Sequence, residues 1–318
     1  MREEYSLKGG REPPFYFSHM KPRNLNSLWM LAAGLFFACM GALVKLGAQK
    51  FSSAELVFYR SLFGLVFIFM FARSTERSLA TPHWKLQLVR SVLGFAALML
   101  FFYAISVLPL ATAVTLNYTS PIFLAILTLF YLRNESRPIL HIAIVMGFIG
   151  VALLLQPEFD QAQWLAGVMG LASGLLAGIV YLQVTKLGRM GEPAWRTVFY
   201  FTLLSTVGSG LWMLIHEFHA LDARDLLLLF AMGSCATLAQ LAMTRAYGKG
   251  SPLVAGSLAY STVVLASLFG IALWNETLSP TSWLGIGMIV LSGVISTLRV
   301  PFFDKSRQPP TLETHQEN

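Results

Sequence analysis

The chain has 318 residues, of which 55% are hydrophobic and only 12% are charged. Soluble domains usually carry about 25% charged residues, so this composition argues against a water-soluble globular protein. The formal net charge of +7 alone would suit a nucleic-acid partner, but the basic residues are distributed as a membrane orientation signal instead.

The apolar residues stand in long blocks, and most reach the roughly 18 to 20 residues with which a helix crosses a bilayer. They are apolar all round rather than alternating, which favours helices over a membrane barrel. The polar tails, 1–25 and 300–318, are expected to be cytoplasmic and disordered. We therefore expect an all-α integral membrane protein with ten transmembrane helices, in chain order at 26–47, 54–72, 87–107, 111–132, 139–156, 164–184, 195–215, 226–246, 252–273 and 281–299.

The sequence repeats itself once with an offset of 141 residues. Each half, 26–156 and 164–299, holds five spans, an odd number, so the second half should enter the membrane from the opposite side. Such inverted repeats are typical of transporters, with the substrate site near mid-membrane between the halves. Four matches share the offset: Lys45-Leu46-Gly47 with Lys186-Leu187-Gly188, Phe58-Tyr59 with Phe199-Tyr200, Leu124-Ala125 with Leu265-Ala266, and Asn134-Glu135 with Asn275-Glu276.

Lys and Arg concentrate in alternate loops, as the positive-inside rule requires. With the N-terminus inside, 19 of the 23 basic residues fall on the inner side, Arg90 among them. Lys50 and Arg224 fall outside, with Lys45 and Arg60 close to that side. The pattern predicts a multi-pass protein of a bacterial-type inner membrane with both termini cytoplasmic.

Several short motifs, taken in order and spacing, resemble the EamA family of the drug/metabolite transporter superfamily over about residues 27–299. The resemblance implies ten helices in two inverted five-helix EamA-like repeats. It leaves the substrate open, because the family includes exporters of amino acids and uptake systems for vitamins and nucleoside-like cofactors. The motifs are Glu55-x-x-x-Tyr59-Arg60, Leu108-Pro109-Leu110-Ala111, Tyr118-Thr119-Ser120-Pro121 and Asn134-Glu135, with Ser251-Pro252-Leu253 and Asn275-Glu276 in the second half.

Three charged residues near the outer side are candidate substrate-binding residues, and their pattern is similar to members that move riboflavin or S-adenosylmethionine. Arg60 lies about six residues, or roughly 9 Å, into its span. It either pairs with an anionic group of the substrate or with Glu55, or it snorkels outward as an anchor. Lys45 can equally snorkel, and Glu55 can equally be a solvated carboxylate at a helix start.

Polar residues deep inside the spans are further candidate substrate-binding residues, because each needs a protein partner, a water molecule or a ligand there. Tyr181 lies near a span end, where an interfacial belt explains it as well. The deep candidates are Asn117, Tyr118, Gln240 and Tyr260.

Two carboxylates and a proline are weaker candidates for gating. Glu135 and Glu276 mark the ends of spans four and nine, where they either act in a gate or end one helix and prime the next. Pro121 either breaks span four to expose carbonyl groups or only kinks it. The GxxxG step at Gly174 and Gly178 indicates close helix packing, with sliding contact during transport as the sharper hypothesis.

The chain contains no Walker pattern, HExxH motif or recognisable Ser-His-acid set, and Cys39 and Cys235 support neither a disulfide nor a metal site. We therefore expect a transporter rather than an enzyme, without cofactor or metal. Its partners should be a small-molecule substrate and the lipid bilayer, not nucleic acid. A monomer is the default, with a homodimer open. The alternatives are a lipid-linked group translocator and, less favoured, a membrane-embedded enzyme or sensor.

Overall fold

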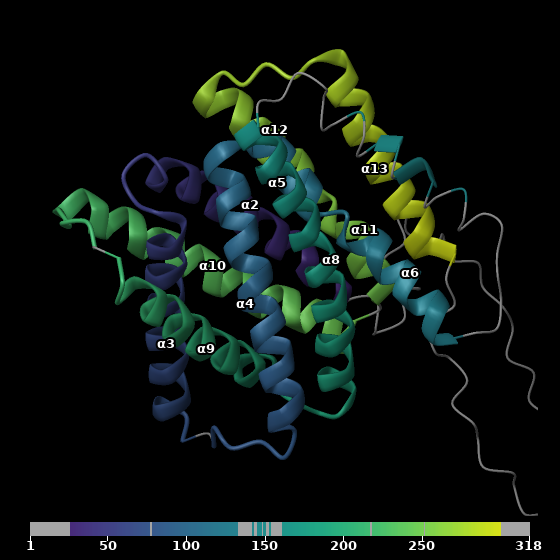
Figure 1. The fold of residues 1–318 in the computed structure, drawn as a ribbon. Coiled ribbons are helices and arrows are strands. Elements are labelled where there is room, and N and C mark those ends of the chain that lie inside the picture. Colours follow the sequence, from purple (N-terminus) through teal and green to yellow (C-terminus); the bar gives the residue numbers. More distant parts are fainter. Residues whose placement is uncertain are drawn as a thin grey trace, which may run out of the picture.

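The computed structural model describes residues 26–76, 78–132, 142, 145–147, 149–150, 153, 161–216, 218–250 and 252–299. Every secondary-structure element in this part of the chain is a helix (Figure 1). In chain order they are α2 (Trp29–Gly47), α3 (Ser53–Ser74), α4 (Trp84–Val107), α5 (Leu110–Asn117), α6 (Ser120–Leu132), α8 (Gln161–Arg189), α9 (Ala194–Met213), α10 (Ala223–Lys249), α11 (Pro252–Ala259), α12 (Ser261–Trp274) and α13 (Pro280–Arg299).

The all-helical architecture expected from the sequence is confirmed. Within the described residues, six stretches are long and apolar enough to cross a membrane: α2, α3, α4, α8, α10 and Val254–Trp274. Large apolar side chains stay exposed on these helices, Met70 at 63% and Leu227 at 69% among them, which suits lipid contact rather than water. The expected span 139–156 lies mostly outside the described residues, so the number of ten spans stays a prediction.

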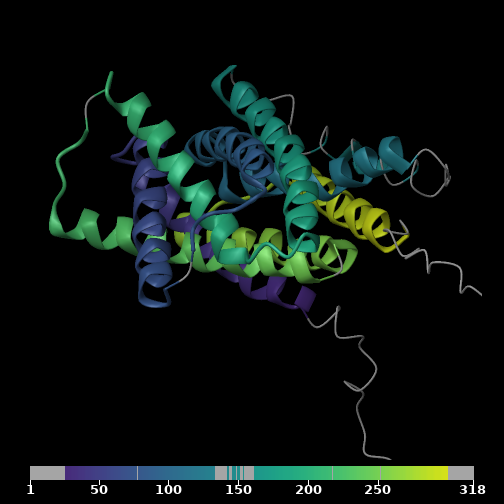
Figure 2. The same ribbon diagram turned by 90° about the horizontal axis from the view of Figure 1, so that it is seen from below.

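The main helix contacts join the two halves of the chain. α2 packs along α10, α4 along α8, and α3 along α9. Figure 2 shows α2 (purple) and α10 (light green) side by side. Under the 141-residue offset, α2 corresponds to α8 and α4 to α10. The α2–α10 and α4–α8 pairs are therefore the same contact made twice with the halves exchanged.

The two spans expected as single helices at 111–132 and 252–273 are each broken in the middle. The first break lies between α5 and α6, where Pro121 lacks the N–H that would bond to the Asn117 carbonyl. There the Thr119 hydroxyl donates to the Leu116 carbonyl at 2.7 Å. The second break falls at Tyr260, the residue 141 positions after Thr119, although no proline follows it. The interruption at Pro121 is one of the two alternatives that the sequence left open, the one at Tyr260 was not predicted, and the two interruptions correspond in position.

Glycines on α2 and α8 let these two long helices pack closely against the helix breaks. A Cβ atom on Gly174 of α8 would lie 2.5 Å from the Thr119 Oγ1 and 2.8 Å from the Leu116 carbonyl oxygen. A Cβ atom on Gly34 of α2 would lie 2.6 Å from the Ser261 Oγ at the second break. Only glycine fits at such distances, so the close packing predicted for the GxxxG step is confirmed at Gly174.

Candidate functional site

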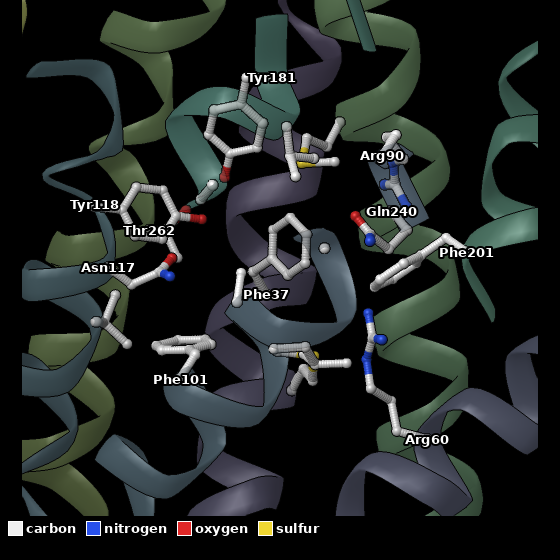
Figure 3. Close-up of a pocket in the computed structure, with 18 residues that line it drawn as sticks. Phe37, Arg60, Arg90, Phe101, Asn117, Tyr118, Tyr181, Phe201, Gln240 and Thr262 are labelled. Carbon is white, nitrogen blue, oxygen red and sulfur yellow. The ribbon is translucent and has the colours of Figure 1, made fainter. Parts of the chain in front are cut away.

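A cavity lies at the centre of the bundle, with walls from both halves of the chain (Figure 3). The volume open to the centres of water-sized molecules is about 90 Å³, whereas a single buried water needs only about 10 to 15 Å³ of such volume. The cavity therefore admits a compact ligand group in this conformation. Its polar and aromatic lining residues are Phe37, Arg60, Arg90, Phe101, Asn117, Tyr118, Tyr181, Phe201, Gln240 and Thr262.

Two arginines dominate one wall. Arg60 of α3 and Arg90 of α4 are only 3% and 1% exposed. Their guanidinium carbons lie 5.3 Å and 4.3 Å from the centroid of the Phe201 ring, on either side of it in Figure 3. Neither the Nε nor the Nη1 of either arginine has a hydrogen-bond partner. The ring quadrupole attracts both cations, but it leaves these N–H donors unmet.

The opposite wall carries neutral polar groups beside the first helix break. Asn117 and Tyr118 come from the end of α5, and Thr262 comes from the first turn of α12 (Figure 3). The Asn117 amide donates to the Ser173 hydroxyl at 2.9 Å, which fixes its orientation. Tyr181 stacks on Tyr247 with 4.6 Å between ring centroids. This wall can donate and accept hydrogen bonds without adding charge.

The described residues that line the cavity include neither Asp nor Glu. The two guanidinium groups therefore give it a positive charge that no lining carboxylate balances. Burying such a charge unpaired is unfavourable by several kcal/mol, whereas an anionic ligand would remove most of that penalty.

The carboxylate of Glu276 joins both halves at one end of the bundle, here called the Glu276 end. It pairs with the ammonium of Lys45 and accepts hydrogen bonds from the backbone N–H of Leu110 at 2.9 and 3.1 Å. Lys45 also donates to the Leu108 carbonyl at 3.2 Å. The N–H of Leu110 is one of the free donors at the start of α5, where a carboxylate is favoured by the helix dipole.

A second carboxylate at the Glu276 end holds a loop in place. Glu55 is fully buried and forms a capping box with Ser52 at the start of α3. It also accepts hydrogen bonds from the backbone N–H and the Nδ1 of His219, both at 2.8 Å. Nearby, the carboxylate of Asp225 accepts a hydrogen bond from Lys50, which raises the pKa of that lysine above its ordinary value.

The other end of the bundle, here called the Glu192 end, is tied by one buried carboxylate. Glu192 pairs with Arg196 at 3.2 Å and accepts a hydrogen bond from the Thr81 hydroxyl. Arg196 in turn donates to the Ser78 carbonyl at 3.0 Å. These contacts join the loop between α3 and α4 to the loop between α8 and α9.

The residues proposed from the sequence fall into two places. Arg60, Asn117, Tyr118 and Gln240 line the cavity together. Tyr260 is buried nearby at the second break, and its hydroxyl has no partner.

The other proposed residues lie away from the cavity. Lys45, Glu55 and Glu276 belong to the Glu276 end instead. Pro121 is the second residue of α6. Glu135 lies outside the described residues.

Several cavity residues were not proposed from the sequence, Phe37, Phe101 and Thr262 among them. Arg90 was counted among the inner-side charges although it lies in the predicted span 87–107, and it was not proposed as a site residue; α4 begins at Trp84 and buries this side chain. Tyr181, for which the sequence left a cavity role and an interfacial belt open, lines the cavity, and Phe201 was not predicted. A signal for Arg90 existed: Gln87, Arg90, Ser91 and Gly94 form a polar stripe at helical spacing, and all four are buried.

The model of the EamA-like transporter family matches residues 25–156 and 164–298. The chain belongs to the EamA-like transporter family. Two matches to one family domain indicate that the chain holds duplicated repeats. This EamA-family chain is a multi-pass membrane transporter and not an enzyme.

Curated relatives of this EamA-family chain are transporters. An uncharacterized transporter of Helicobacter pylori is 30% identical over 85% of this chain and 93% of its own length. The pseudopaline exporter CntI of Pseudomonas aeruginosa is 26% identical over 83% and 93%. A riboflavin transporter of Vibrio cholerae is 25% identical over 84% and 90%. A solved structure with 20% identity has a TM-score of 0.66 and covers 87% of this chain and 98% of its own, so it shares the fold.

Proposed function

We propose that this chain moves a small organic metabolite across a bacterial inner membrane by alternating access, with the central cavity as its substrate site. The observation that carries the proposal is the pair of broken helices, which interrupt both repeats at corresponding positions beside the cavity. Transporters built from inverted repeats hold their substrates at such breaks, because half-helix ends supply free N–H and C=O groups there.

In this proposal the chain crosses the membrane ten times, and the two five-helix repeats have opposite orientation. The distribution of Lys and Arg then puts both termini in the cytoplasm. The Glu276 end accordingly faces the outside, and the Glu192 end faces the cytoplasm. The α2–α10 and α4–α8 contacts support this symmetry. In each contact, the first long helix of one repeat packs against the third long helix of the other repeat.

Glu276 acts as a gate residue in this scheme. Its carboxylate connects Lys45 on α2 with the start of the half-helix α5, so the contact must break before the outer side can open. Lys45 and the N–H of Leu110 would then be hydrated. The contact thus favours the conformation that is closed at the Glu276 end.

Arg60 is the substrate-contacting residue in this proposal, with Gln240 in the same lining and Asn117 and Tyr118 on the opposite wall. Among the described residues, the cavity lining contains neither a carboxylate nor a histidine, the groups that proton-coupled carriers commonly use. This favours facilitated diffusion or exchange. Export of an amino acid or metabolite and uptake of a vitamin or cofactor of the riboflavin or S-adenosylmethionine type both fit the family. A lipid-linked group translocator is the alternative.

The test is a thermal-shift screen of the purified protein against amino acids, vitamins and nucleoside-like cofactors, followed by flux of each stabilising compound into proteoliposomes. A ligand at 100 times its dissociation constant stabilises by about 2.7 kcal/mol, which is readily detected. Flux that Arg60→Ala abolishes and the exposed Arg224→Ala leaves intact supports the proposal. A stabilising compound that is never transported contradicts it.

A further inference from the structure

The two buried arginines of the cavity are the charged groups in the described part of the chain whose polar atoms stay most poorly satisfied. Both are at least 97% buried, and the Nε and Nη1 of each lack a hydrogen-bond partner. A guanidinium group removed from water in this way calls for an anion, since its five N–H donors cannot be neutralised by loss of a proton.

The buried and half-buried carboxylates at the two ends of the bundle are engaged elsewhere. Glu55 bonds with Ser52 and His219, and Glu276 bonds with Lys45 and the start of α5. Glu192 pairs with Arg196 at the far end. None of the three lines the cavity. Among the described residues, therefore, the cavity's own walls supply no counter-ion for Arg60 or Arg90.

The two guanidinium groups lie close enough together to contact one ligand in the cavity. Both guanidinium groups contact the same Phe201 ring, so they can be no farther apart than the sum of their distances to its centroid. Their like charges repel across this gap, and a ligand with one negative charge would leave half of that charge unbalanced. Gln240 stands next to Arg90 in Figure 3 and offers an amide to the same ligand.

We propose that the substrate is a compact organic acid with two negative charges, held with one acidic group against Arg60 and the other against Arg90. Its uncharged part faces Phe37, Tyr118 and Asn117 on the neutral wall. This inference rests on the proposed function, since it names the substrate class of the same cavity. A neutral ligand would leave both charges buried and unpaired, and a cationic ligand such as a sulfonium compound would add a third.

The test measures dissociation constants by thermal shift on the full-length protein in detergent, at low and at high salt. The compounds are α,ω-dicarboxylates from malonate to adipate, their monoamides and their diamides. Glycerol phosphate is tested as a second kind of doubly charged compound. We expect one dicarboxylate or the phosphate ester to bind about tenfold or more tightly than the matched compound with one charge. Whichever of the two kinds of compound binds more tightly shows whether the site prefers a dicarboxylate or a phosphate ester.

The matched variants are Arg60→Gln, Arg90→Gln and, as the control, the exposed Arg224→Gln. Each cavity variant should lose the preference for two charges over one, whereas the control keeps it. Arg90→Gln should also melt at a higher temperature than the wild type without ligand, because it removes an unpaired buried charge. Arg90→Lys retains a charge and should retain part of the preference.

Two outcomes overturn the inference, and they can be told apart from failure of the transport proposal. If no dianion stabilises the protein, or if a neutral or cationic metabolite stabilises wild type and Arg60→Gln/Arg90→Gln equally, the substrate class is wrong. Flux of that metabolite into proteoliposomes would still support transport. A dianion that binds through both arginines but is never transported contradicts the transport proposal and leaves the binding site standing.

Discussion

The charged side chains at the centre of the bundle and those at its Glu276 end differ in whether the protein supplies them with hydrogen-bonding or ionic partners. At that end, Glu276 is satisfied by Lys45 and a helix start, and Glu55 by His219 and a capping box. In the cavity, Arg60 and Arg90 share an aromatic ring and meet no carboxylate. The satisfied charges join helices, whereas the two arginines without a carboxylate partner among the described residues form the site proposed for the substrate.

The largest expected effect is that of Arg60→Gln on transport. Loss of this cation should reduce flux of the substrate at least a hundredfold, because a hydrogen-bonded charge pair with the substrate disappears. The purified variant should remain folded and melt no lower than wild type, since removal of an unpaired buried charge offsets the lost contact with the Phe201 ring. Near-normal flux by this variant would remove Arg60 from the substrate site and weaken the contrast between the two regions.

Glu276→Gln should act in the opposite sense, mainly on stability and gating. The neutral amide leaves Lys45 without its counter-charge, which should destabilise the protein by about 1 to 3 kcal/mol in a chemical or thermal melt. In the double variant with Lys45→Met, most of this loss should be recovered, because no unpaired charge remains. If the two changes are simply additive, the ion pair contributes nothing to the closed end.

Gly174→Val tests whether the first helix break depends on close packing. The added side chain would meet the Thr119 hydroxyl and the Leu116 carbonyl, and overpacking of this kind is unfavourable by about 1 to 3 kcal/mol. Gly287→Val is the matched control, because a Cβ there meets nothing within 4 Å. Equal melting temperatures for the two variants would show that α8 does not need to approach the break.

The smallest effect is expected for Glu55→Gln on substrate binding. The variant weakens the capping box of α3 and the hydrogen bond with His219, so the free energy of unfolding should fall by about 1 to 2 kcal/mol. The dissociation constant of the transported compound should change less than twofold, since Glu55 does not line the cavity. A large change in affinity with unchanged stability would place Glu55 in the substrate site after all.

The sequence was sufficient for the helices, and for Arg60, Asn117, Tyr118 and Gln240 as cavity residues, because a polar side chain deep in an apolar block is visible without a structure. It was insufficient for Arg90, because this residue stands near the start of the predicted span 87–107, where a basic side chain is read as an inner-side charge, and the sequence does not show that its side chain is buried. The first break was signalled by Pro121, whereas the break at Tyr260 has no local sequence mark. The partner of Glu276 lies 231 residues away in sequence, a distance over which local patterns carry no information.

The most direct measurement uses a single cysteine in the cavity wall, Ala177→Cys, in a chain whose Cys39 and Cys235 are replaced by serine. A membrane-impermeant maleimide is applied to intact cells and, separately, to inside-out vesicles. The account predicts slow labelling from both sides, protection by the transported compound, and faster labelling from outside when Glu276→Gln is added. Labelling from one side only, or no protection by the compound, would contradict alternating access to this cavity.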